Sequence, residues 1–503
     1  MANSVNLSTF IRPEKITRKL YLLMTSFHTE GQALPIAQVA QQAFEQHAAY
    51  KEPSLRHRRF KHHDIVPLLE QLRHHPLFEV QVVGKSVEKR DIYLVKAGTG
   101  KTKVMLWSQM HGDEATATMA LFDLLHFLQQ ADQMDPVRQQ ILRDTTLYFI
   151  PMLNPDGAER FTRRNALEID LNRDAQRLQS PEAELLKNLR TQLNPAIGFN
   201  LHDQSIYYTA GGTSKPATVS FLAPAFDHAQ TVDAVRGRAM RTIVGMNEAL
   251  QQLIPGQVAK FSDEHEPRAF GDNIQKWGTS VILVESGGYH NDPEKQYIRR
   301  LNFAALVSGL HLIAGQGYDA YELEDYYSIP ENQRNLYDLV IRNVRYQTSG
   351  REVLLDAGIL REEVETPAAQ GFYYRSIVEE LGDMSTFYGY EELDGDGLQL
   401  VPGKVYEEPF DNIAALPAER ARELLASGYT TVRLADLPDP QHPFALPLNA
   451  LSLTGEADHG LGMGRGADFT LQDARGTVRY AVVNGFVHDL AAEKPSPFYG
   501  LVL

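Results

Sequence analysis

Short apolar runs alternate with stretches of helical spacing through the middle of the chain. Continuous runs such as Val104 to Met110 and Ser280 to Val284 have the length of buried strands. Between them, Leu121 to Leu128 and Glu182 to Leu193 repeat apolar residues at helical spacing. Strands and helices that alternate in this way predict an α/β domain, with a mixed twisted sheet flanked by helices.

The pattern differs at both ends of the chain. Residues 34–44 have apolar positions at helical spacing and predict an N-terminal helical segment. Between Tyr326 and Asn335, long helices give way to short strands and turns. We therefore expect three parts: a helical segment over residues 1–55, the α/β domain over 56–328, and an all-β sandwich over 329–503.

Ionisable residues follow the ends of several predicted strands. His111 and Glu114 come after the first apolar run, His202 ends the stretch Phe-Asn-Leu-His, and Glu285 ends the stretch Val-Ile-Leu-Val-Glu. In open α/β sheets, ligands bind in the crevice at the carboxyl ends of the strands. Taken singly, each of these residues also fits an ordinary surface or core position. Taken together, they predict one shared site.

This ordered set of motifs, over about residues 60–315, resembles the zinc metallocarboxypeptidases, the carboxypeptidase A-like or funnelin peptidases. The resemblance implies that one Zn²⁺ per chain is bound by His111, Glu114 and His202. Two imidazoles and one carboxylate leave a fourth tetrahedral position for water, as in other catalytic zinc sites. The implied function is hydrolysis of the C-terminal peptide bond of peptides by a zinc-activated water.

The resemblance also implies roles for five further residues. Glu285 matches the general base, and Arg163 matches the arginine that stabilises the oxyanion, with the adjacent Arg164 as the alternative. The pair Asn172-Arg173 matches the residues that bind the terminal carboxylate of the substrate, a task that suits a guanidinium because it donates two parallel hydrogen bonds. Asp170 matches a carboxylate that orients a zinc-binding histidine.

One departure from the family pattern affects the expected substrate. Carboxypeptidase A-like enzymes place a mobile tyrosine about twenty residues before the catalytic glutamate, whereas this chain has no tyrosine between Lys260 and Glu285. Arg268, in the same segment, is a candidate for an alternative substrate contact. Two other functions therefore stay open: a zinc amidase acting on peptidoglycan stem peptides or N-acyl amino acids, and an inactive binding protein.

The C-terminal part contains a second resemblance. Tyr337 to Val344, Glu391 to Gly403 and Gly464 to Gly485 resemble the opening and closing strands of the amidohydrolase superfamily. No histidine metal motif follows Pro402-Gly403, and the following segment is too short for a barrel of about 250 residues. We expect a non-catalytic β-sandwich; the alternative is generic β-sandwich sequence.

The composition argues against several kinds of partner and site. The net charge of -15 and the lack of a long basic run argue against nucleic acid as a partner. The absence of cysteine excludes disulfides and thiolate metal sites. No apolar run is long enough to predict a transmembrane helix, and Lys15 to Phe27 has the charge order of a signal peptide without a convincing cleavage site. We expect a cytoplasmic protein, with a periplasmic or secreted one as the alternative; the oligomeric state stays open.

Overall fold

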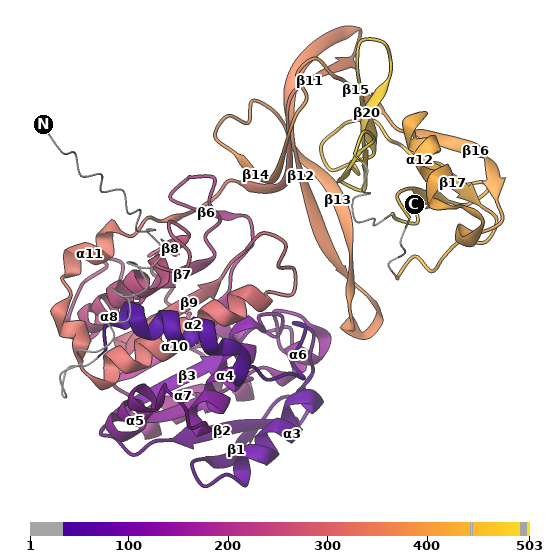
Figure 1. Ribbon diagram of the computed structural model, residues 1–503. Helices are drawn as coiled ribbons and strands as arrows, with labels where there is room; N and C mark the ends of the chain where they lie inside the picture. Colours follow the sequence, from indigo (N-terminus) through magenta and orange to yellow (C-terminus); the bar gives the residue numbers. More distant parts are fainter. Residues whose placement is uncertain (1–33, 443, 445, 493–499) are drawn as a thin grey trace, which may run out of the picture. The chain divides into compact units, whose positions relative to one another are not determined.

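The structure is a computed structural model that describes residues 34–442, 444, 446–492 and 500–503. The segment Lys15 to Phe27, with its signal-like charge order, lies outside the described residues. From Ile36 onward the chain forms one compact unit. This unit contains an α/β region, followed by a β-rich C-terminal region (Figure 1).

The α/β region is built on a mixed sheet of eight strands. In spatial order the strands are β1 (Glu79–Lys85), β2 (Asp91–Ala97), β4 (Thr145–Ile150), β3 (Thr102–Ser108), β5 (Ile197–Asp203), β9 (Ser280–Ser286), β7 (Val219–Leu222) and β8 (Val258–Lys260). The four central strands β4, β3, β5 and β9 are parallel. Their near-continuous apolar sequence follows from burial on both faces, as is usual for parallel strands. The prediction of a mixed sheet is confirmed.

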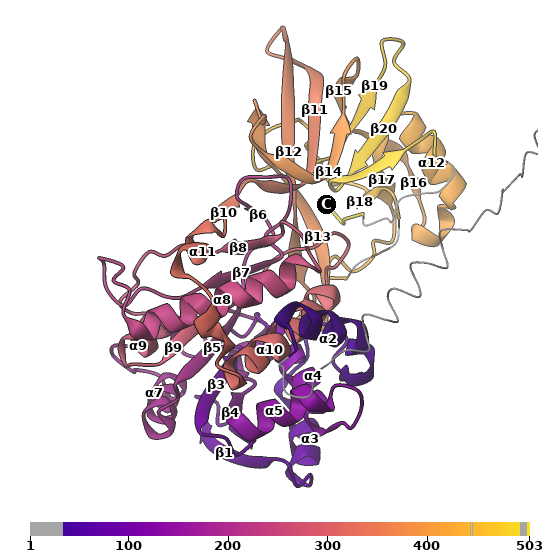
Figure 2. The ribbon, with the colours of Figure 1, turned by 60° about the vertical axis from the view of Figure 1, so that its left-hand side comes forward.

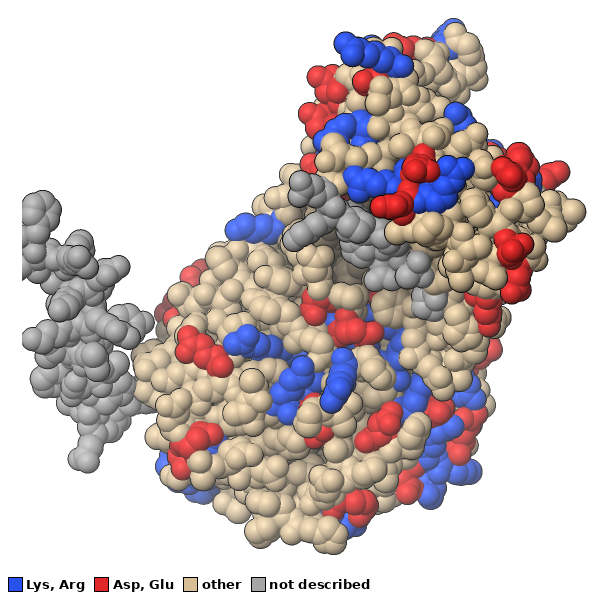
Figure 3. Space-filling view, turned by 45° about the vertical axis from the view of Figure 1, so that its right-hand side comes forward, with Lys and Arg blue, Asp and Glu red and all other residues tan. Residues whose placement is uncertain are grey.

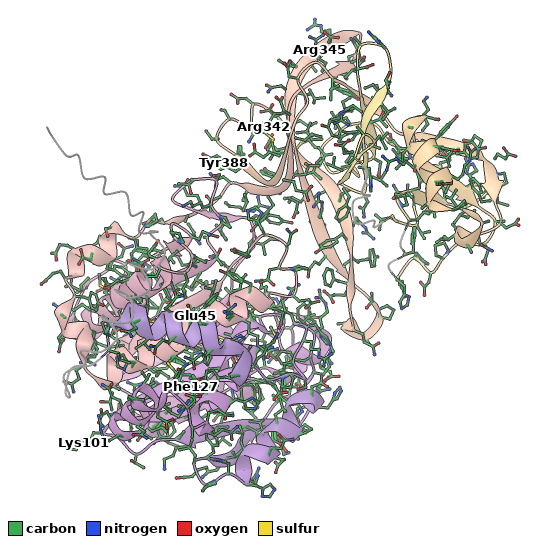
Figure 4. The ribbon with its side chains drawn as sticks, viewed as in Figure 1. Glu45, Lys101, Phe127, Arg342, Arg345 and Tyr388 are labelled. Carbon is green, nitrogen blue, oxygen red and sulfur yellow. The ribbon has the colours of Figure 1, made fainter. Side chains whose placement is uncertain are left out.

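Helices cover both faces of this sheet (Figures 1 and 2). They are α2 (Ile36–Tyr50), α3 (His62–Arg73), α4 (Thr116–Gln129), α5 (Asp135–Asp144), α6 (Pro155–Arg160), α7 (Pro181–Leu193), α8 (Ala234–Gln251), α9 (Phe270–Lys276), α10 (Gln296–Ala314) and α11 (Leu323–Ser328). On one face, Leu186 of α7 and Ile274 of α9 share a core with Met105 and Trp107 of β3. Elsewhere in the helix layer, the fully buried Phe127 of α4 contacts the rings of Tyr50 and Phe303, whereas Glu45 on α2 is exposed (Figure 4).

The C-terminal region is β-rich, as expected. Its larger sheet contains, in spatial order, β13 (Phe372–Gly382), β12 (Arg351–Glu365), β11 (Leu336–Thr348), β15 (Gln399–Pro402), β19 (Phe469–Gln472), β20 (Val478–Val483) and β21 (Phe486–Asp489), with β14 (Tyr388–Asp394) also paired to β11. A smaller parallel sheet contains β16 (Lys404–Phe410), β17 (Tyr429–Leu434) and β18 (Asn449–Leu451). Beside it lies the helix α12 (Ala418–Ala426), an element that the sequence analysis did not anticipate.

Several hydrogen bonds join the two regions at the loop that follows β5. The strand β6 (Tyr208–Ala210) of this loop pairs with β10 (Asn332–Arg334). Tyr207 donates its hydroxyl to Asp338 at 2.8 Å, and Tyr390 of β14 donates to the carbonyl of Ile206 at 2.7 Å. The C-terminal region therefore holds a loop that follows the strand of one predicted metal ligand, His202.

Charged side chains of both signs are interspersed on the face shown in Figure 3. Within the part of the chain that the structure describes, no helix is both long and apolar enough to cross a membrane.

Candidate metal centre

Three of the predicted site residues meet at the carboxyl ends of the central strands. His111 and Glu114 follow β3, and His202 is near the end of β5, the strand next to β3. All three side chains are buried, and their ligand atoms lie within 4.8 Å of one another. The structure thus brings together the ligand set that the sequence predicted.

The distances within this cluster fit a metal ion. The Nδ1 atoms of His111 and His202 are 3.2 Å apart, and they lie 2.7 and 2.6 Å from the two carboxylate oxygens of Glu114. Ligand atoms at the Zn–N distance of about 2.0–2.1 Å in a tetrahedral site lie roughly 3.3 Å from each other. The distance between the two imidazole nitrogens fits this value, whereas Glu114 lies at hydrogen-bonding distance from both of them. The three side chains thus form a candidate site for one cation.

A second carboxylate, that of Asp170, orients the ring of His111 through its other nitrogen. Its Nε2 atom lies 3.1 Å from Asp170, as expected for a carboxylate that holds a zinc-binding histidine. Burial alone lowers the pKa of His111, but the carboxylates of Glu114 and Asp170 outweigh burial and raise it to about 9. Burial raises the pKa of Glu114, but the imidazoles of His111 and His202 outweigh burial and hold this pKa well below its usual range. Glu114 is therefore ionised.

The turn that carries His111 and Glu114 is fixed by close packing. A side chain at Gly112 would place its Cβ 2.0 Å from the backbone of Gly157 in α6, so only glycine fits. Gln109, in the left-handed backbone region with φ of 48°, donates its side-chain amide to the carbonyl of Gly112 at 2.9 Å. This packing sets the direction in which the two ligands leave β3.

Glu285 lies at the end of β9, in register with the ligand His202 on the neighbouring strand. It is buried, and burial together with the carboxylates of Glu114 and Asp203 raises its pKa well above the usual value. Its Oε2 atom has no hydrogen-bond partner among the described residues. An unsatisfied buried carboxylate is costly, which is typical of a group placed for chemistry rather than for stability.

A cation that the sequence analysis missed lies close by. Lys295 donates from Nζ to Asp203 at 3.1 Å and to the carbonyl of Ser286 at 3.0 Å. Both Asp203 and Lys295 are largely buried. Asp203 directly follows the ligand His202, a hint that the sequence does contain, but no spacing pattern connects Lys295 to the site.

The geometry distinguishes Arg163 from its neighbour Arg164. Arg163 donates to Asp170 at 3.0 Å, and its Nη1 atom is 3.1 Å from Nδ1 of His111, while 43% of the side chain stays exposed. Arg164 donates instead to the carbonyl of Glu168. Arg163 is therefore the arginine that faces both the ligand cluster and solvent.

The pair Asn172-Arg173 lies next to α9. Asn172 accepts a hydrogen bond from the backbone of Phe270 at 2.9 Å, so its side-chain oxygen is already used within the fold. Arg173, with 37% of its side chain exposed, pairs with Glu266 at 3.2 Å. Arg268 pairs with the same carboxylate at 2.7 Å. Glu266, which the sequence analysis did not single out as a site residue, thus lies between the two arginines.

Part of the chain is similar to known proteins. Residues 65–211 match the family model of zinc carboxypeptidases. Carboxypeptidase SOL1 of Arabidopsis thaliana is 36% identical over 104 residues, which are 21% of this chain and 21% of that protein. Carboxypeptidase D of Anas platyrhynchos is 26% identical over 144 residues, 25% of this chain and 10% of that protein. The chain thus matches only a minor part of these relatives.

Two solved structures are also similar to part of the chain. The putative carboxypeptidase A from Shewanella denitrificans OS-217 is 20% identical, with a TM-score of 0.42, over 50% of this chain and 68% of that one. Carboxypeptidase A from Helicoverpa armigera is 15% identical, with a TM-score of 0.41, over 61% of this chain and 86% of that one.

The family match includes all three metal ligands together with Arg163, Asn172 and Arg173. It ends before Glu285, whose place in the site rests on its register with His202. Over residues 65–211, the α/β region of this chain is similar to the zinc carboxypeptidase family.

Proposed function

We propose that the protein is a zinc-dependent metallocarboxypeptidase that hydrolyses the C-terminal peptide bond of peptides. The observation that carries the proposal is the convergence of His111, Glu114 and His202 beside the buried carboxylate of Glu285. One zinc ion per chain, when bound by these ligands, would supply the Lewis acidity that activates a water molecule and polarises the scissile carbonyl.

Glu285 is suited to move the proton. With its pKa raised by burial and by neighbouring carboxylates, it accepts a proton from the attacking water and passes it to the leaving amine. Arg163 is suited to bind the negative charge that develops on the carbonyl oxygen, because its guanidinium is held next to the ligands by Asp170. These two residues would divide proton transfer and charge stabilisation between them.

Arg173 is suited to bind the free carboxylate of the substrate. A guanidinium donates two parallel hydrogen bonds to a carboxylate, which selects peptides that end in the site. The carboxylate of Glu266 now pairs with Arg173. A substrate carboxylate must therefore replace Glu266, which keeps its second partner Arg268.

A zinc amidase is the second candidate. It is favoured by the segment before Glu285, where Glu266 and Arg268 occupy the region in which a mobile tyrosine was expected and not found. The same ligands and base would hydrolyse the amide bond of a muropeptide or of an N-acyl amino acid.

The test is metal analysis by mass spectrometry combined with release of C-terminal residues from a mixed peptide library, before and after chelation. We expect about one zinc per chain and release that stops with chelation and returns with zinc. Zinc without release from peptides, but with hydrolysis of muropeptides or N-acyl amino acids, would favour the amidase. Absence of zinc would overturn the assignment of the ligands.

A further inference from the structure

A buried arginine of the α/β region is held by the C-terminal region. Arg59 is only 1% exposed at its side chain. It donates from Nε and Nη2 to Glu365 at 2.7 and 2.6 Å, and from Nη2 to Glu363 at 2.8 Å. Both carboxylates belong to β12, in the hairpin that β12 forms with β13. Charge-assisted bonds of this kind, with two carboxylates on one guanidinium, fix its plane.

The same guanidinium is enclosed by two aromatic rings. Its central carbon lies 4.4 Å from the ring centroid of Phe161 and 4.2 Å from that of Phe372. Both distances are within the range of about 6 Å in which a cation is attracted to a ring face. Phe372 is the first residue of β13, whereas Phe161 ends α6 in the α/β region. Arg59 thus connects the hairpin to the end of α6.

The backbone of Phe161 has an energetically unfavourable conformation. Its φ and ψ of 53° and 53° lie in the left-handed region, which costs a residue with a side chain about 1–2 kcal/mol. Residues in such conformations persist when their surroundings hold them there. Two positions later comes Arg163, which contacts Asp170 and His111 in the metal centre. The backbone conformation of Phe161 therefore sets the position of the segment that contains Arg163.

We propose that the β12–β13 hairpin is a positioning element of the metal centre: Arg59 fixes Phe161, and Phe161 sets the backbone that aims Arg163. The inference rests on the proposed function for the role of Arg163. It assigns to the C-terminal region a part in the reaction, without any contact between that region and the substrate. Arg59 is a positioning residue in this arrangement.

The neighbouring Arg58 provides a matched control. It donates to the same carboxylate, Glu363, at 2.6 and 2.7 Å, but its central carbon lies 5.8 Å from the ring of Phe161, at the outer limit of the attractive range, and it contacts no second ring of the described residues. The variant Arg58→Met removes this ion pair between the two regions, together with a longer one to Glu294 at 3.9 Å, and leaves the rings that enclose Arg59 in place. A role limited to joining the two regions predicts similar effects for Arg58→Met and Arg59→Met.

The first experiment is a double-mutant cycle in the full chain loaded with zinc. We expect Arg59→Met to lower kcat about ten-fold with unchanged KM and zinc content, since small displacements of a binding group cost this much. In the background of Arg163→Ala, the same change should lower kcat less than two-fold, because its effect is transmitted through Arg163. If the two effects multiply, or if Arg58→Met lowers kcat equally, the proposal is wrong.

A second readout does not depend on activity. Amide hydrogen exchange of residues 157–165 should become at least ten-fold faster in Arg59→Met and in the milder variant Glu365→Gln, and stay unchanged in Arg58→Met. If exchange is faster in these two variants but the parent protein hydrolyses no substrate, the proposed function is rejected and the positioning role is kept. Unchanged exchange in both variants of an active parent would reject the positioning role alone.

Discussion

At the scale of single residues, Glu285 is set apart by its surroundings. Burial raises the pKa of Glu285, and the nearby carboxylates of Glu114 and Asp203 raise it further. We expect Glu285→Gln to lower kcat by about 10²–10⁴-fold, the usual contribution of a general base, with zinc content and KM unchanged. Glu184→Gln, on the exposed face of α7, is the control. Hydrolysis at the parental rate by Glu285→Gln would show that another group takes the proton.

Glu266 gives a second prediction at this scale. The hydrogen bonds from Arg268 lower its pKa to about 2, so it is ionised at neutral pH and competes with a substrate carboxylate for Arg173. We expect Glu266→Gln to lower KM by about three- to ten-fold with little change in kcat, since removing this competitor favours the bound substrate and the transition state equally. Glu264→Gln, an exposed residue of the same segment, should change neither constant. A KM that rises in Glu266→Gln would place the substrate carboxylate elsewhere.

The residues that the sequence could reveal share one property. His111, His202 and Glu285 follow predicted strands, and the carboxyl ends of parallel strands meet at one edge. Lys295 and Glu266 come from connections between elements, whose paths depend on tertiary packing and have no periodicity. The ligand set was therefore predictable, whereas Lys295 and Glu266 were not.

At the scale of elements, three helices meet at a buried ionic cluster. Asp123 of α4 accepts hydrogen bonds from Arg299 of α10 and lies 2.7 Å from His47 of α2, and both Asp123 and Arg299 are fully buried. Burial raises the pKa of Asp123, but the bonds from His47 and Arg299 outweigh it, so the pKa is lowered. The cluster attaches α2 to the helices beneath it.

The sign of this pKa shift gives a prediction on stability. A carboxyl group with a lowered folded-state pKa stabilises the fold above its unfolded value of about 3.9, and the contribution is lost as pH falls through the folded value. We expect Asp123→Asn to lower the free energy of unfolding by about 3–5 kcal/mol at pH 7, and by less below pH 4. Thermal unfolding at several pH values measures this difference. Glu45→Gln, on the exposed face of α2, is the control and should show no such dependence on pH (Figure 4). If the difference in stability between the parent and Asp123→Asn stays constant from pH 7 to pH 3, the prediction is wrong.

Elements with a strong local pattern were predictable. The helices α4 and α7 and the strands β3 and β9 are present where the apolar pattern placed them. The helix α12 and the pairing of β6 with β10 were not predicted. A nine-residue helix and three-residue strands contain too few positions to show a period, and their partners lie far away in the sequence.

At the scale of the whole molecule, metal binding should be coupled to stability. A ligand that binds only the folded state stabilises it by about 4 kcal/mol at a thousand times its Kd. We expect a chelator to lower the Tm of the protein and added zinc to restore it, because three buried ligands converge on one point. Differential scanning calorimetry checks this, with His202→Ala as a variant that should no longer respond to zinc. A Tm independent of zinc in the parent would show that the cluster holds no such ion.

The contact between Arg59 and the hairpin also has a consequence for the order of synthesis. Glu363 and Glu365 follow Arg59 by 304 and 306 positions. At about 5–20 residues per second, the ribosome makes these carboxylates roughly 15 to 60 s after the arginine. Once His202 has been made, the α/β region has its three candidate metal ligands, while the guanidinium that supports Phe161 still lacks both carboxylates and one of its two rings. The nascent chain thus acquires its ligands early and completes the support of Arg163 only once the hairpin has been made.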